Sequence, residues 1–123
     1  MSNNCNQYVI KHLIVEILKE ADRDLEFFMH TKSRLSRYYQ LDEQETIDCA
    51  VRIIIDLVKN GFCSLAQGSH PYALVQKTEE ELRQLDFDND CGTFLISTKK
   101  GADWVRRYEN LVEELTVGDA AYR

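Results

Sequence analysis

Apolar residues recur every three or four positions between Ile10 and Phe28, which is the spacing of one face of an α-helix. The charged residues of this segment, Glu26 among them, lie mostly on the opposite face. The pattern predicts one long amphipathic helix over residues 6–30. Any fold of this chain must therefore cover one side of that helix.

A second helical pattern runs from Ile47 to Val58. Asp42 or Thr46 can serve as its N-cap, and Gly61 stands where a left-handed residue commonly ends a helix. The apolar face is wide. We therefore expect this helix to be buried on more than one side, against the first helix and a small sheet.

Shorter elements fill the rest of the chain. Thr78 and Glu81 have the spacing of a capping box, so residues 78–85 predict a short helix with acidic residues at its positive end. The polar, basic residues 30–40 fit either a short helix or a structured link. The other expected elements are a strand at 62–66, a turn at 67–71, an extended piece at 72–75, an acidic loop at 86–92, a strand at 93–97 and a last helix from Thr98 to Leu115.

Together these elements predict an α+β fold, helix-dominated, with a small antiparallel sheet of two or three strands. The 123 residues are 44% hydrophobic and 29% charged with a single proline, which fits one compact domain over residues 1–123. The wide apolar helix faces are compatible with a monomer and with a dimer.

The second half of the chain has the element order of a winged-helix domain. The segment RIIIDLVKNGFCSLAQG at 52–68 is a helix that ends in glycine and leads into a strand, and FLISTKKGADWVRRY at 94–108 is a return strand that turns into a final helix. On these two segments the chain resembles winged-helix proteins over residues 42–115. The resemblance implies a winged-helix-like domain and, as one function, a transcription regulator that binds DNA.

The charge is concentrated in the middle of the chain. The net charge is −6, and residues 41–92 alone carry eleven acidic and four basic side chains. Residues 79–90, the region that corresponds to a wing, carry six acidic residues against Arg83. Because phosphate neutralisation supplies most non-specific DNA affinity, this distribution argues against nucleic acid and favours a basic protein partner.

We predict that the partner is bound by this acidic cluster together with two aromatic anchors, since aromatic residues tend to carry interface energy. A solvated helix face followed by a polar loop is the alternative interpretation of the same cluster. The candidate partner-binding residues are Tyr72, Glu79, Glu80, Glu81, Asp86, Phe87, Asp88 and Asp90.

The sequence predicts no enzyme, no catalytic residue, no metal site and no cofactor. No two of the four cysteines are spaced as a zinc or redox pair, and we expect reduced thiols, with Cys49 and Cys63 in the core. A calcium loop beginning at Asp86 lacks the glycine and glutamate of an EF-hand, having Cys91 and Ser97 in their places.

One stretch is both basic and aromatic and has the composition of a single-strand binding segment. One alternative is a polar connector whose tyrosines pack on the helices. Another is a segment that docks against the acidic residues 41–92 of the same molecule or of another copy. The stretch consists of Lys32, Arg34, Arg37, Tyr38 and Tyr39.

In size, charge and winged-helix-like pattern the chain resembles bacterial immunity proteins, including those of contact-dependent growth inhibition systems. This resemblance implies a cytoplasmic protein that neutralises a basic toxin, such as a nuclease domain, through its acidic surface. The start Met-Ser-Asn-Asn lacks the basic and apolar parts of a signal peptide, and no apolar run is long enough to span a bilayer. We therefore expect no membrane association.

Overall fold

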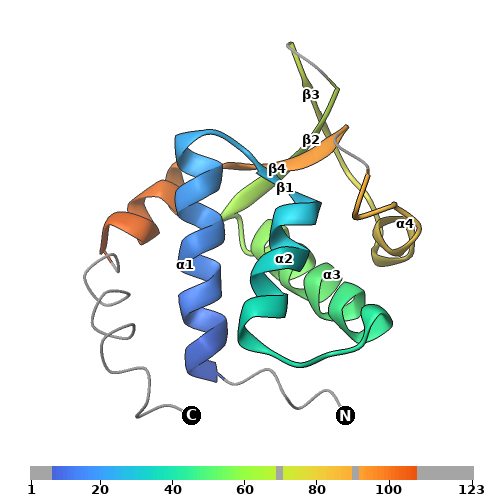
Figure 1. Ribbon diagram of the computed structural model, residues 1–123. Helices are drawn as coiled ribbons and strands as arrows, with labels where there is room; N and C mark the ends of the chain where they lie inside the picture. The colour runs from blue at the N-terminus through green and yellow to red at the C-terminus, as the bar shows by residue number, and fades with distance from the viewer. Residues whose placement is uncertain (1–6, 69–70, 90–91, 108–123) are drawn as a thin grey trace.

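The computed structural model describes residues 7–68, 71–89 and 92–107 (Figure 1). Residues 99–107 form a helix at the end of this part of the chain. The fold is α+β, as predicted, but the antiparallel sheet has four strands where the sequence predicted two or three. The preceding elements are α1 (Gln7–Arg23), β1 (Glu26–Phe27), α2 (Phe28–Tyr38), α3 (Glu43–Lys59), β2 (Cys63–Gln67), β3 (Ala73–Val75), α4 (Glu79–Arg83) and β4 (Thr93–Ser97).

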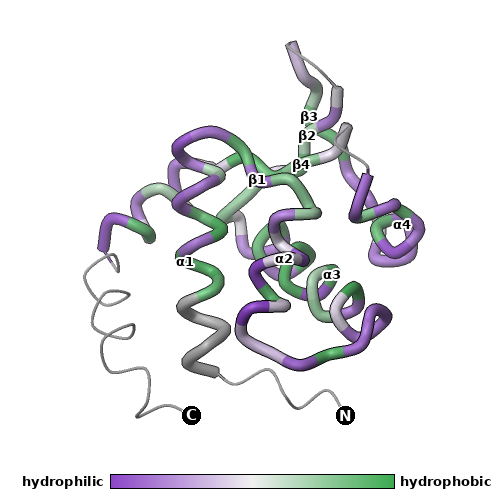
Figure 2. The backbone as a smooth tube through the Cα atoms, in the orientation of Figure 1, coloured by the Kyte–Doolittle hydropathy of each residue, from purple (hydrophilic) through white to green (hydrophobic). Residues whose placement is uncertain are grey.

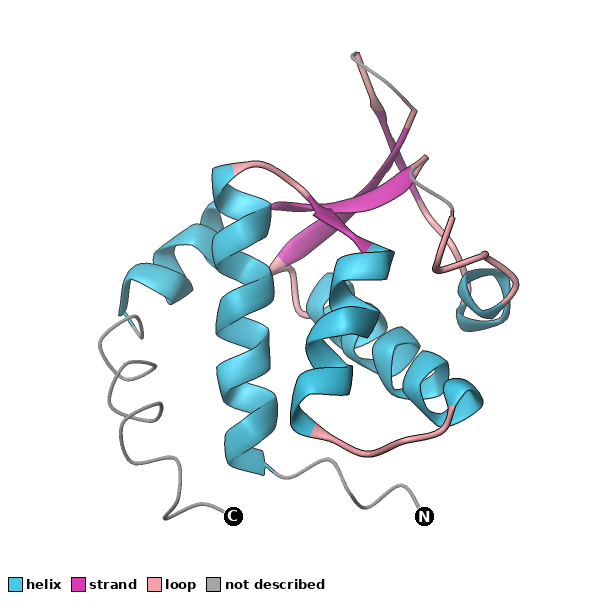
Figure 3. Cartoon of the chain, viewed as in Figure 1, coloured by secondary structure: helices cyan, strands magenta, loops and turns pink. Residues whose placement is uncertain are grey.

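The strands form one antiparallel sheet in the order β1-β4-β2-β3. Leu65 of β2 pairs with Leu95 of β4 on one side and with Val75 of β3 on the other. The helices α1, α2 and α3 lie beneath the sheet (Figure 3), and the core forms between them. Leu65 and Leu95 meet Ile54 of α3 in this core.

Two local signals set the limits of α3 as the sequence predicted. Asp42 accepts a hydrogen bond from the backbone N–H of Glu45, and the Glu45 carboxylate accepts one from the backbone N–H of Asp42, which completes a capping box. Gly61 follows the helix with φ of 80°, a left-handed conformation that a side chain would strain. The helix contacts α2, α4 and β2, so its wide apolar face is indeed covered on several sides.

The predicted single helix over residues 6–30 is wrong. α1 ends at Arg23, and the chain then forms β1 before α2 begins at Phe28. In β1, Glu26 pairs with Leu95, and Phe27 pairs with Phe94 of β4. Helix propensities differ by only about 0.7 kcal/mol per ordinary residue, so strand pairing at the open edge of β4 outweighs them here.

Most of the shorter elements are confirmed. β2, β3, α4 and β4 match the expected pieces, and residues 30–40 are largely the helix α2 rather than a link. Thr98 caps the last helix by accepting a hydrogen bond from the backbone N–H of Gly101 at 3.1 Å. The predicted continuation of this helix to Leu115 lies outside the described residues.

Hydropathy along the backbone shows where this fold buries its apolar side chains (Figure 2). Hydrophobic residues gather where α2, α3 and the sheet face one another, whereas α4 is mostly hydrophilic. Within the described ranges, no helix is both long enough and apolar enough to cross a membrane.

Candidate functional site

The helix α4 holds three consecutive glutamates at the surface. Thr78 is its N-cap, and the Thr78 hydroxyl accepts from the backbone N–H of Glu81 while the Glu81 carboxylate accepts from the backbone N–H of Thr78 at 2.8 Å. This last bond lowers the pKa of Glu81. Leu82 is fully buried and anchors the helix, whereas Glu79 and Glu80 are exposed. The short helix therefore presents its carboxylates to solvent.

The loop after α4 continues the acidic surface. The side-chain amide of Asn89 donates to Asp86 at 2.8 Å, and the backbone N–H of Asp88 donates to it at 3.1 Å. These two bonds lower the pKa of Asp86, so this carboxylate stays charged below its ordinary titration range. Asp86 and Asp88 are exposed, and Asp90 lies outside the described residues.

The prediction of Phe87 as an interface anchor is wrong. Its side chain is 2% exposed and belongs to the core, with its ring centroid 5.3 Å from that of Phe28. The ring fixes the acidic loop to α2 and is unavailable to a partner. In the sequence Phe87 lies between Asp86 and Asp88, and these charged neighbours led to the prediction that its ring is exposed.

Two cations from the chain itself are embedded among the acidic residues. Arg83 bonds Asp48 of α3 at 3.1 Å and Glu79 at 2.7 Å. Lys32 of α2 bonds Asp88 at 2.8 Å and Glu43 at 2.5 Å. The charges of Glu79 and Asp88 are therefore balanced by cations of the chain itself. One of the three interpretations of the basic stretch 32–39 was docking against the acidic middle of the chain, residues 41–92. Lys32 makes this contact.

These pairs leave a net negative face. Hydrogen bonds from neutral donors orient Glu80, Glu81 and Asp86 without cancelling their charge. Lys77 lies close enough to favour ionised Glu81. Seven carboxylates and three cations then leave four negative charges on what we call the acidic surface. It comprises Lys32, Glu43, Asp48, Lys77, Glu79, Glu80, Glu81, Arg83, Asp86 and Asp88.

An apolar edge adjoins the acidic surface. β3 is the last strand of the sheet, so one side of it has no neighbouring strand in the described structure. Leu74 is 65% exposed and Tyr72 is 44% exposed, with the Tyr72 ring edge-on to Phe94. Only three residues separate Val75 from Glu79. At about 3.5 Å per residue, the backbone of Leu74 thus lies within about 18 Å of that of Glu79, and the backbone of Tyr72 within about 25 Å.

Tyr72 was predicted as an anchor and is accessible, whereas Leu74 was missed. Leu74 lies between Ala73 and Val75 in an apolar run that is typical of any short strand, so the local sequence gives no sign that its side chain is exposed. What exposes it is the edge position of β3, a property of the sheet order and not of the local sequence.

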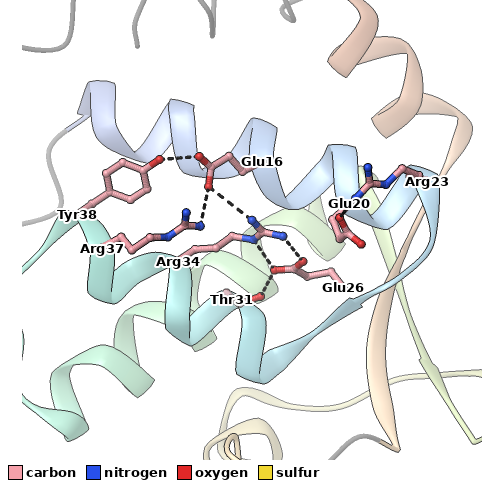
Figure 4. A network of polar contacts seen from close by, with 8 residues as sticks. All are labelled: Glu16, Glu20, Arg23, Glu26, Thr31, Arg34, Arg37 and Tyr38. Atoms are coloured by element: carbon pink, nitrogen blue, oxygen red, sulfur yellow. Dashed lines mark hydrogen bonds and ion pairs between the residues drawn. The ribbon is translucent and has the colours of Figure 1, made fainter.

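A second polar cluster joins α1, β1 and α2 (Figure 4). Glu26 has no exposed surface, and Arg34 donates to both of its carboxylate oxygens at 3.0 Å, with Thr31 adding a bond at 2.9 Å. Glu26 raises the pKa of Arg34 through this bidentate pair. Charged groups buried in this way are stable only when paired, and here every oxygen of the carboxylate has a donor.

The same cluster occupies most of the basic, aromatic stretch of α2. Glu16 of α1 accepts from Tyr38 at 2.6 Å and lies 3.4 Å from Arg37 and 3.6 Å from Arg34. These side chains point toward Glu16 of α1 (Figure 4). We interpret the cluster as structural: it clamps α1 and α2 to the first strand of the sheet.

The two described cysteines, Cys49 and Cys63, are buried in the core, as predicted. Burial, with a smaller contribution from Glu26, raises the pKa of Cys63 to about 12. Since the thiolate is the reactive form, Cys63 is unsuited to nucleophilic or redox chemistry at neutral pH. In the part of the chain that is described, no three His, Cys, Asp or Glu side chains are grouped as metal ligands would be.

No protein-family model, curated protein or solved structure matches this chain.

Proposed function

We propose that this chain is a cytoplasmic immunity protein that binds and neutralises a basic toxin, such as a nuclease domain. The observation that carries the proposal is the acidic surface on α4 and its loop, which keeps an excess of four negative charges after internal pairing. Such a surface attracts a cationic protein and repels polynucleotides.

The exposed apolar side chains of β3 would supply the binding energy that the charged residues do not. Charged residues at the rim of an interface mostly set the association rate, whereas buried aromatic and aliphatic anchors hold the complex. Tyr72 and Leu74 are exposed, and they lie in the segment that leads into α4. The open side of β3 also offers backbone groups to a partner strand. In this mechanism the carboxylates take the place of nucleic-acid phosphates on the toxin's lysines and arginines.

The test uses the product of the neighbouring reading frame as the candidate toxin. The triple variant Glu80→Gln, Glu81→Gln, Asp86→Asn removes three carboxylates that make no salt bridge within the described residues, and the glutamine that replaces Glu81 can still complete the capping box. We expect its association with a cationic partner to slow by about tenfold at low salt, and the difference to shrink as salt rises.

A matched control removes three exposed carboxylates elsewhere, at Asp22, Asp24 and Asp56. We expect this control to bind at nearly the wild-type rate. Equal association rates for the two triple variants would reject the acidic surface as the binding site. Failure of the wild-type chain to protect cells from the toxin would reject the immunity function itself.

A winged-helix regulator that binds DNA is the alternative. The order α1, β1, α2, α3, β2, β4, with β4 between β1 and β2, supports a winged-helix arrangement in which β3 and α4 are inserted between the last two strands. The charge opposes DNA binding, because α3 carries four acidic residues against Arg52 and Lys59. Sequence-selective retention of a duplex in a gel shift at physiological salt would favour this alternative over immunity.

A further inference from the structure

The molecule has a basic recess that the proposed function does not use. The recess lies between the start of β2 and the helical residues 99–107, on the opposite side from α4 in Figure 1. Its volume is about 390 Å³, within the range of small-molecule sites. The lining residues are Phe62, Lys99, Lys100, Asp103, Trp104 and Arg107.

Two aromatic rings form the apolar part of the recess. The centroids of Phe62 and Trp104 are 5.7 Å apart, and the ring planes are tilted by 58°. Lys100 reaches over Phe62, with its ammonium nitrogen 4.9 Å from the ring centroid, and donates to the Asn60 carbonyl oxygen at 2.8 Å. A cation and an aromatic face thus contact each other at this place, and a ligand of the Phe62 ring would also meet the Lys100 ammonium group.

The polar part of the recess is positively charged. Lys99, Lys100 and Arg107 line it, and Arg106 is close by through its 3.0 Å bond to Asp103. Asp103 is the one acidic residue of the lining, and its other oxygen pairs with Lys99 at 2.9 Å. Among the described residues, the lining and its neighbour Arg106 contribute four cations against one carboxylate, so the recess itself is basic.

The walls of the recess are held together before any ligand arrives. The backbone N–H of Thr98 donates to the Phe62 carbonyl oxygen at 3.2 Å, and the Thr98 hydroxyl donates to the Gly61 carbonyl oxygen at 2.5 Å. Gly101 packs directly on the same Phe62 carbonyl, where an added Cβ would clash. Both aromatic residues are therefore positioned by backbone contacts.

We propose that this recess binds a nucleotide, with the base against Phe62 and Trp104 and the phosphate on Lys99, Lys100 and Arg107. Aromatic side chains beside a positive groove are the general means by which proteins hold a base and its phosphate. An inorganic anion or an acidic peptide would use the cations and leave the ring pair without a role. The nucleotide is either free or part of a single strand.

Trp104 reports binding directly, because it is the only tryptophan of the chain. The full chain is titrated with AMP while tryptophan fluorescence is measured, and adenosine, ribose 5-phosphate and pyrophosphate serve as partial ligands. We expect saturable quenching by AMP with a Kd below about 1 mM and weaker binding of all three partial ligands. Absence of saturable quenching, or equal affinity for ribose 5-phosphate or pyrophosphate and AMP, overturns the proposal.

Two variants separate the ring from the charge. Phe62→Leu keeps an apolar side chain and should weaken AMP binding by at least about 5-fold, the lower limit for loss of a stacking ring. Lys100→Gln should weaken it by about 2- to 5-fold without disturbing the core. Arg52→Gln on the exposed part of α3 makes the same charge change outside the recess and should bind as the wild type does. If Lys100→Gln and Arg52→Gln bind AMP alike, the recess is not the site.

The source of the nucleotide is decided by a second titration with a short single-stranded oligonucleotide. Tighter binding of the strand than of AMP, lost in Phe62→Leu, identifies a strand as the ligand. Equal or weaker binding identifies a free nucleotide. Both results stand apart from the immunity test, since neither uses α4 or a toxin.

Discussion

Glu26 shows how much of this fold depends on one residue. In the sequence it lies among charged positions that alternate with an apolar helical face, a pattern that predicts exposure to solvent. In the structure it starts the first strand and is wholly buried against Arg34. Arg34 is eight residues away, and β4 almost seventy, so no local pattern could reveal either partner. The prediction for Phe87 failed for the same reason, since Phe28 buries it.

The energetic weight of Glu26 can be measured. Glu26→Ala leaves Arg34 partly buried without its partner. We expect the free energy of unfolding to be lower than that of the wild type by about 3–5 kcal/mol. Glu26→Gln keeps the shape of the side chain and one acceptor oxygen, so the decrease in the free energy of unfolding should be smaller. Chemical denaturation of both variants gives these differences. A loss below about 1 kcal/mol for Glu26→Ala would show that the cluster is dispensable.

At the scale of whole elements, the sequence predicted best where the signal is short-range. The Thr78 capping box and the Gly61 terminus lie within three or four residues of the helix ends they define and were predicted, and Asp42 was one of the two N-caps considered for α3. The strand β1 could not be found in this way. It has only two residues, and both pair with β4, which is far away in the sequence. The contact between the last helix and the α3–β2 turn was equally hidden.

That contact is sensitive to a single methyl group at Gly101. An added Cβ would meet the Phe62 carbonyl oxygen, which belongs to the backbone and cannot rotate away. We expect Gly101→Ala to destabilise the fold by about 1–3 kcal/mol, although alanine is the better helix former. Thermal unfolding measures the loss, with Lys99→Ala in the exposed first turn as a control. Equal stability of the two variants would mean that the turn adjusts freely.

For the molecule as a whole, two carboxylates of the acidic surface, Glu81 and Asp86, should remain charged over the entire physiological range. The pKa values of Glu81 and Asp86 lie below 4.5 and 3.8, the ordinary values of such groups. Their ionised forms are thus favoured in the fold, and this contribution is lost only as the pH falls through those lowered values. We expect the association rate with a cationic partner to be constant from about pH 8 to about pH 5 and to fall below that. A decline already between about pH 7 and about pH 6, near the pKa of histidine, would implicate a different group.

The separation of the acidic surface from the basic recess gives the described part of the chain an electric dipole. A dipole of this kind rotates in the field of an approaching protein, so that α4 is turned toward a cationic surface before contact. The same torque would turn residues 99–107 toward an anion. Orientation, rather than net charge alone, then selects which end of the molecule each ligand meets first.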